Sequence, residues 1–217
     1  MALSERFDCH GYYKKYNMEG DIHIGGGTLR VHDIFNPLPE FMKEIDVLIS
    51  DPPCTKGNLN SFYTKADKAD EHKDSFDGFE KRYFECIDEI APKMVFLETF
   101  KDNTDSFYSA LCERYEYVKK FDIFYYKTSP CSWLVASHEP IPMTYFDAFT
   151  GKNEDVCIKW VCDNVEASCI GDLCMGTGLV GWYAYKAGKK FAGTELNKKR
   201  LAMLIEGINT GRQVSQA

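Results

Sequence analysis

The sequence has no long apolar run, and its cysteines lack metal-ligand spacing. The most hydrophobic region is interrupted by Asp172 and Lys186, so it falls short of the roughly 20 apolar residues that a bilayer-spanning helix needs. The intervals of five or seven residues among Cys157, Cys162 and later cysteines do not match the CxxC spacing of structural zinc sites. We therefore expect no membrane association and no metal.

The beginning of the chain lacks an apolar stretch, and the chain as a whole lacks an excess of basic residues. MALSERFDCHGYYKK carries charges where a signal peptide has an apolar stretch, so we expect a cytoplasmic protein whose nine cysteines are reduced. The net charge of -7 opposes tight binding to phosphate backbones, which clustered lysines and arginines drive. A nucleic-acid partner then needs a local basic face or help from another subunit.

Short apolar runs rich in β-branched and aromatic residues alternate with helical patterns along the chain. This alternation is typical of an α/β fold with a mostly parallel sheet, and 217 residues suit one domain over 1–217. Seven strands are expected at 29–34, 46–50, 94–98, 121–127, 132–136, 168–173 and 190–195, and helices at 79–91, 103–115, 154–165, 179–188 and 197–209. The polar, aperiodic segment 55–78 predicts a long mobile loop.

A glycine turn follows the strand at 168–173. Gly176-Thr177-Gly178 lets a ligand approach the backbone, and the helix that follows favours negative charge at its N-terminus. Glu195 ends the next strand, about 20 positions on, where an acid suits two ribose hydroxyls. The pattern predicts a nucleotide-type site; a dinucleotide is the competing ligand, although the third glycine of its fingerprint has no good match.

The strand at 46–50 stops at Asp51-Pro52-Pro53. Two prolines hold the chain in a rigid turn at the carboxyl end of a strand, where open α/β sheets bind ligands. The Asp51 carboxylate and the Pro52 carbonyl are then fixed acceptors. Two acceptors facing an exocyclic NH2 group orient its lone pair toward a methyl donor.

Both motifs resemble those of one enzyme family. DPPC is similar to the DPPY, DPPF or DPPW motif of the amino-group DNA methyltransferases, which modify adenine N6 or cytosine N4; GDLCMGTG and GTELNKKR are similar to their DPFxGxG and GIELNxxR segments. The target motif precedes the cofactor motif, as in the permuted, beta-like class of that family. The resemblance implies a Rossmann-like S-adenosylmethionine (SAM)-dependent methyltransferase fold with helices on both faces of the sheet. It implies SAM contacts by Asp33, Asp172, Leu173, Cys174, Gly176, Thr177, Gly178, Glu195, Leu196 and Asn197.

The chief departure from the family pattern is Cys54, where the family has an aromatic residue that stacks on the flipped base. Phe62 and Tyr63 just downstream are the candidate substitutes, although both could simply pin the loop to the core. Alternatively, Cys54 resembles the nucleophile of the cytosine C5 methyltransferases, with Glu98 as the acid that binds their base; Cys54 could also be a small filler.

The expected substrate is DNA with a flipped or single-stranded base, adenine or cytosine, in the manner of compact phage enzymes. Between Asp51 and Asp172 the chain has room for three strands and their helices, so no separate target-recognition domain is expected. Selectivity then comes from a homodimer or a partner subunit, or is low. A cofactor-binding subunit without turnover, and an RNA, protein or small-molecule methyltransferase, remain alternatives.

Overall fold

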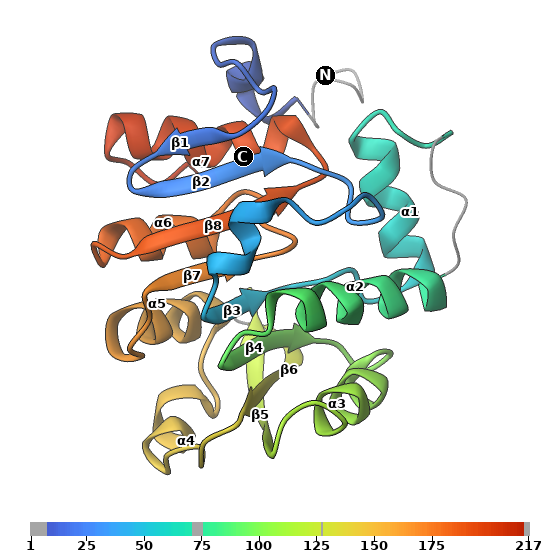
Figure 1. The fold of residues 1–217 in the computed structure, drawn as a ribbon, viewed down its shortest axis with the longest axis vertical. Coiled ribbons are helices and arrows are strands. Elements are labelled where there is room, and N and C mark those ends of the chain that lie inside the picture. The colour runs from blue at the N-terminus through green and yellow to red at the C-terminus, as the bar shows by residue number, and fades with distance from the viewer. Residues whose placement is uncertain (1–7, 71–75, 127, 215–217) are drawn as a thin grey trace.

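The computed structural model describes residues 8–70, 76–126 and 128–214. Its eight strands form one sheet in the order β1-β2-β8-β7-β3-β4-β6-β5 (Figure 1). The strands are β1 (Ile22–Ile24), β2 (Gly27–Val31), β3 (Val47–Ser50), β4 (Met94–Thr99), β5 (Tyr117–Tyr125), β6 (Ser129–Ser137), β7 (Cys169–Asp172) and β8 (Lys190–Glu195). The helices are α1 (Lys56–Lys65), α2 (Phe76–Ile90), α3 (Thr104–Cys112), α4 (Thr144–Phe149), α5 (Glu154–Asn164), α6 (Leu179–Lys186) and α7 (Lys198–Thr210), with 3-10 turns η2 (Cys9–Lys14) and η3 (Glu40–Glu44).

The central strands of the sheet are parallel. β2 pairs with β8, β8 with β7, β7 with β3 and β3 with β4 in parallel, whereas β6 runs antiparallel between β4 and β5. The last two strands of the chain, β7 and β8, therefore lie between two strands of its first quarter, β2 and β3. This interleaving brings the carboxyl ends of distant segments to one edge of the sheet.

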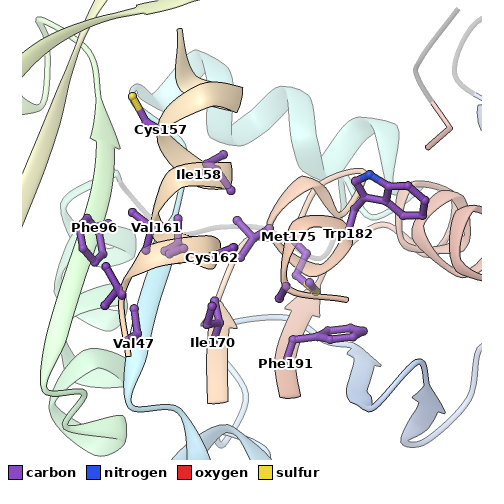
Figure 2. Close-up of a cluster of buried hydrophobic side chains, with 14 of the residues drawn as sticks. Val47, Phe96, Cys157, Ile158, Val161, Cys162, Ile170, Met175, Trp182 and Phe191 are labelled. Atoms are coloured by element: carbon purple, nitrogen blue, oxygen red, sulfur yellow. The ribbon is translucent and has the colours of Figure 1, made fainter. Parts of the chain in front are cut away.

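Two apolar cores hold the helices against opposite faces of the sheet. On one face, α4, α5, α6 and α7 pack on side chains such as Phe96, Ile170 and Phe191, and Figure 2 shows Val161 of α5 over this surface. On the other face, η3, α1, α2 and α3 pack on alternate strand residues such as Leu48 and Val95. The alternation follows from the two-residue period of a strand that is buried on both sides.

The α/β class, the mostly parallel sheet and the helices on both faces agree with the sequence-based expectation, but the sheet has eight strands and not seven. The additional strand β1 pairs antiparallel with the outer side of β2, with Ile22 opposite Leu29. It is only three residues long, too short for a periodic signal in the sequence.

The segment 55–78, expected as a loop, contains α1 and the beginning of α2. Thr55 caps α1, because its side chain accepts a hydrogen bond from the Asn58 amide, and Leu59 and Tyr63 bury one face four residues apart. Only two buried positions in ten residues left too weak a periodicity for the sequence to reveal this helix. Residues 71–75 of the expected loop lie outside the described residues.

One smaller feature also differs from expectation: the sequence did not predict helix α4. Within the described ranges, none of the helices is long and apolar enough to cross a membrane.

Candidate active site

The two sequence motifs meet because their strands are neighbours. β3 pairs with β7, so Asp51 and the glycine turn both follow carboxyl ends at the middle of the sheet. Ser50 at the end of β3 donates a hydrogen bond from Oγ to Asp172 Oδ1 at the end of β7, at 2.8 Å. Both turns open onto a single cleft of about 1400 Å³.

Most of the residues singled out from the sequence line this cleft. They are Asp33, Asp51, Pro53, Phe62, Tyr63, Glu98, Asp172, Leu173, Cys174, Gly176, Thr177, Glu195, Leu196 and Asn197. Three do not: Pro52 is buried beneath the turn, Cys54 is half-buried beside it, and Gly178 lines a small adjoining hollow. The fold thus gathers residues from both ends of the chain into one site.

The glycine turn needs its glycines. Gly176 and Gly178 have φ of 55° and 85°, in the left-handed region that favours glycine. A Cβ on Gly178 would lie 2.4 Å from Leu204 Cβ, so α7 packs directly against the turn. The Gly176 amide donates to Glu195 Oε2 at 2.6 Å, and the Asn197 amide donates to Glu195 Oε1 at 2.8 Å. The turn and the Glu195 carboxyl therefore form one rigid unit.

Asp33 lies just beyond β2 at the same edge of the sheet. Its Oδ1 accepts hydrogen bonds from the Tyr63 hydroxyl at 2.8 Å and from the Phe35 amide at 3.2 Å. Tyr63 is 3% exposed and belongs to the core that holds α1. In this structure Tyr63 positions Asp33, whereas Phe62 on the same helix is half-buried and faces the cleft.

Carboxyl groups dominate the electrostatics of the cleft. Burial, with the nearby charges of Asp51 and Glu154, raises the pKa of Glu98 to about 9. Burial likewise raises the pKa of Asp172 to about 8, against the hydrogen bonds from Cys174 and Ser50. Several acids in one desolvated space cannot all be ionised, so Glu98 holds a proton at neutral pH.

Asp51 lines the same cleft as these acids and the glycine turn. Desolvation raises its pKa to about 7, with the Glu154 charge adding to the rise and Arg200 opposing it. The Asp51 side chain is nevertheless exposed to the open cleft. Because Asp51 is open to the cleft, water stabilises its charged form and limits this rise.

Cys54 has a different environment. Burial and the neighbouring Asp51 charge raise the pKa of the Cys54 thiol. The Cys54 amide donates to Asn58 Oδ1 at 3.3 Å, which ties the residue to the first turn of α1. This surrounding disfavours a thiolate, the form in which cysteine acts as a nucleophile.

Glu154, Trp133 and Arg200 are among the cleft residues that were not predicted from the sequence. Glu154 begins α5 and accepts a hydrogen bond from the Tyr126 amide at 3.1 Å, Trp133 lies opposite Glu98 on β6, and Arg200 projects from α7. Only Arg200 had a signal, because it ends the GTELNKKR segment. Among the described residues, no group of histidine, cysteine, aspartate and glutamate side chains suits a metal ion.

No protein-family model matches the sequence, and neither does any curated protein. Solved structures do match. M1.HpyAVI superposes with a TM-score of 0.54 at 13% identity, over 84% of this chain and 99% of that one, and its complex with SAM gives 0.55 over 83% and 98%. TTHA0409 of Thermus thermophilus, a protein named as a DNA modification methylase, gives 0.55 at 12% identity over 84% and 94%.

The chain has the fold of SAM-dependent methyltransferase structures. The similarity is one of fold and covers nearly the whole length of those proteins, while the sequences have diverged to 12–13% identity. The methyltransferase fold of this chain includes both turns at the carboxyl edge of the sheet.

Proposed function

We propose that this protein is a SAM-dependent methyltransferase that modifies the exocyclic amino group of adenine (N6) or cytosine (N4) in DNA. The observation that carries the proposal is the meeting of the Asp51 turn and the Gly176 turn in one cleft, linked by the Ser50–Asp172 hydrogen bond of 2.8 Å. A methyl group held at one turn faces an acceptor held at the other. Methyl transfer requires this proximity and orientation.

The cleft fits SAM by shape and charge. The fold neighbour M1.HpyAVI has been solved with SAM, and Gly176 and Thr177 of the glycine turn line the cleft of this chain. Glu195 would bind the ribose hydroxyls and Asp33, held by Tyr63, would contact the adenine side. Surrounding carboxyl groups complement the sulfonium and ammonium charges of the donor.

The chemistry follows from where Asp51 lies. The bound donor supplies an electrophilic methyl group on its sulfonium. The Asp51 carboxylate accepts a hydrogen bond from the substrate amino group and thereby orients the nitrogen lone pair toward that methyl. When the C–N bond forms and the C–S bond breaks, the nitrogen gives up one proton, which Asp51 or water can take. Burial raises the pKa of Asp51, and a raised pKa makes its carboxylate a better proton acceptor.

A cytosine C5 methyltransferase is the second candidate, because Glu98 lies in the cleft and holds a proton. That mechanism needs a thiolate at Cys54. The half-buried Cys54 has a raised pKa and does not line the cleft, which weighs against it. We therefore infer direct transfer to an amino group, with no covalent enzyme–base bond.

We further infer a compact, permuted enzyme in which target selection comes from a second copy or a partner subunit. The acidic cleft admits a neutral base more readily than a phosphate backbone, and the net charge of -7 works against binding the duplex strongly. A flipped or single-stranded base, in the cytoplasm, is the expected substrate.

The test is incubation with isotope-labelled SAM and mixed DNA and RNA, followed by nucleoside mass spectrometry. We expect labelled N6-methyladenine or N4-methylcytosine in DNA. Asp51→Ala should abolish the product, by a factor of roughly 100 to 1000 or more, while leaving donor binding intact. Labelled 5-methylcytosine, lost in both Cys54→Ala and Cys54→Tyr, would instead establish the C5 mechanism. Donor binding without turnover on any nucleic acid would leave a cofactor-binding subunit or a different methyl acceptor.

A further inference from the structure

Arg200 is a cation in a cleft whose charged side chains are mostly acidic. It projects from the first turn of α7 and lines the cleft together with the carboxyl groups of Asp33, Asp51, Glu98, Glu154, Asp172 and Glu195. Its charge lowers the pKa of both Asp51 and Glu195 against the dominant effect of their burial. The guanidinium therefore lies within electrostatic reach of both the target turn and the cofactor end of the site.

Packing fixes where the guanidinium points. Its centre lies 5.1 Å from the centroid of the Phe62 ring on α1, a distance typical of a cation–π contact. A Cβ on Gly176 would lie 2.7 Å from Arg200 Nη2, so the guanidinium sits directly against the glycine turn. Arg200 Nε is buried and has no hydrogen-bond partner among the described residues. A buried donor of this kind is costly unless a ligand satisfies it.

The lysines of the cleft have different surroundings. Lys14 forms an ion pair with Asp8 at 3.6 Å, and Lys65, the last residue of α1, lies with its Nζ 5.6 Å from the Phe62 ring centroid. The three atoms that lie nearest to a Cβ on Gly176 belong to Arg200 and not to either lysine. Arg200 is thus the cation of the cleft that lies against the Gly176 turn.

SAM carries a carboxylate as well as its two positive charges. The carboxyl groups of the cleft suit the sulfonium and the ammonium, but they repel the carboxylate at close range. We propose that Arg200 binds the α-carboxylate of the methyl donor and so fixes the donor's amino-acid end against the Gly176 turn. This inference rests on the proposed methyltransferase function. The planar guanidinium matches a carboxylate with two parallel hydrogen bonds, which a lysine cannot do.

The test compares two ligands that differ only in the carboxylate. S-adenosylhomocysteine has it, and S-adenosyl-3-thiopropylamine is the same molecule without it. Calorimetric titration of the wild-type chain should show about 10- to 100-fold tighter binding of S-adenosylhomocysteine, the range expected for hydrogen bonds to a charged group. Arg200→Met should lose that same factor for S-adenosylhomocysteine and leave the affinity for the decarboxylated ligand within about 3-fold. Lys198→Met, on the same helix but outside the cleft lining, should change neither affinity.

Two outcomes would overturn the inference. Equal weakening of both ligands by Arg200→Met would assign a structural role to Arg200. If Arg200→Met binds S-adenosylhomocysteine as wild type does, Arg200 does not belong to the donor site. If that variant also binds a single-stranded oligonucleotide more weakly, Arg200 contacts a phosphate of the substrate. Retained binding of the decarboxylated ligand shows that a variant is folded. If the wild-type chain binds neither ligand, the methyltransferase proposal itself is wrong. Results with the variants bear only on the role of Arg200.

Discussion

At the scale of single residues, the site depends on acids whose surroundings set different protonation states. Asp51 is exposed to the cleft, whereas Glu98 is 2% exposed and has no hydrogen-bond partner at Oε1 among the described residues. The same chemical group therefore serves as a charged acceptor at one position and a neutral acid at the other. Both states follow from burial and from neighbours on other elements.

The raised pKa of Glu98 predicts a pH-dependent cost to stability. Its pKa is about 9 in the folded protein and 4.5 in its ordinary state, so the folded protein holds a proton that the unfolded chain releases as pH rises. Stability should fall from about pH 4.5 upward and level off near pH 9. Glu98→Gln keeps the shape without the ionisation, and should be more stable than wild type by on the order of 3 kcal/mol at pH 8.

Thermal or urea unfolding of both proteins from pH 4 to 9 measures this difference, which should vanish near pH 4. Wild-type and Glu98→Gln curves that run parallel over the whole range would mean that Glu98 ionises freely in the fold.

Tyr63 gives a second residue-scale prediction. Tyr63→Phe removes the hydroxyl that holds Asp33 at 2.8 Å and keeps the ring in the core. We expect affinity for S-adenosylhomocysteine to fall about 3- to 10-fold, the worth of one hydrogen bond, because the Asp33 carboxylate loses the shorter of the two hydrogen bonds that its Oδ1 accepts. Tyr117→Phe, at an exposed strand position, is the matched control in the same calorimetric assay. An unchanged affinity in Tyr63→Phe would show that Asp33 does not contribute to donor binding.

At the scale of elements, α1 connects the two halves of the site. It follows the Asp51 turn directly, presents Phe62 to the cleft against Arg200, and buries Tyr63 against Asp33. Asn197 beyond β8 also donates from its side chain to the Lys65 carbonyl at the end of α1, at 3.0 Å. The stability of α1 should therefore influence the binding of both the methyl donor and the methyl acceptor.

The N-cap of α1 provides the test. Thr55 accepts from the Asn58 amide at 3.1 Å, and Thr55→Ala should destabilise the helix by about 0.5–2 kcal/mol. Hydrogen exchange should accelerate by roughly the corresponding factor at the amides of α1 and remain unchanged in α5, because fraying is local. Thr55→Ser preserves the capping oxygen and should exchange as wild type does. Equal acceleration in α1 and α5 would show that α1 unfolds only with the whole domain.

At the scale of the whole molecule, the order of the motifs along the chain is independent of their arrangement in space. The N-terminal turn η2 packs on the C-terminal helix α7, where the Tyr16 hydroxyl donates to Glu206 at 2.6 Å. Asp8 and Val214, at the two ends of the described chain, both line the cleft. The N-terminal and C-terminal segments of the described chain therefore pack together, as is common where permutation is tolerated.

A circular permutant should consequently fold. Joining the termini with a Gly/Ser linker and opening the chain between Glu166 and Ala167, in the connection that precedes β7, places the cofactor motif first. We expect a melting temperature within about 10 °C of wild type and donor affinity within a few-fold, since every strand pairing is preserved. Opening the chain between Leu48 and Ile49, inside buried β3, is the control that should not fold. Loss of donor binding in the first permutant alone would show that chain order matters to the site.

The sequence by itself determined the local features of this protein. Apolar runs marked the buried strands at 46–50 and 190–195, and the proline and glycine turns identified both sides of the cleft, because such residues restrict or free the backbone wherever they occur. The sequence did not reveal α1, because the two buried residues of this helix give too weak a helical period. Only the tertiary structure decided that Glu154 and Arg200 join Asp51, that Tyr63 holds Asp33, and that Glu98 keeps its proton. Distances between residues far apart in the chain set these properties, and the order of strands in the sheet sets those distances.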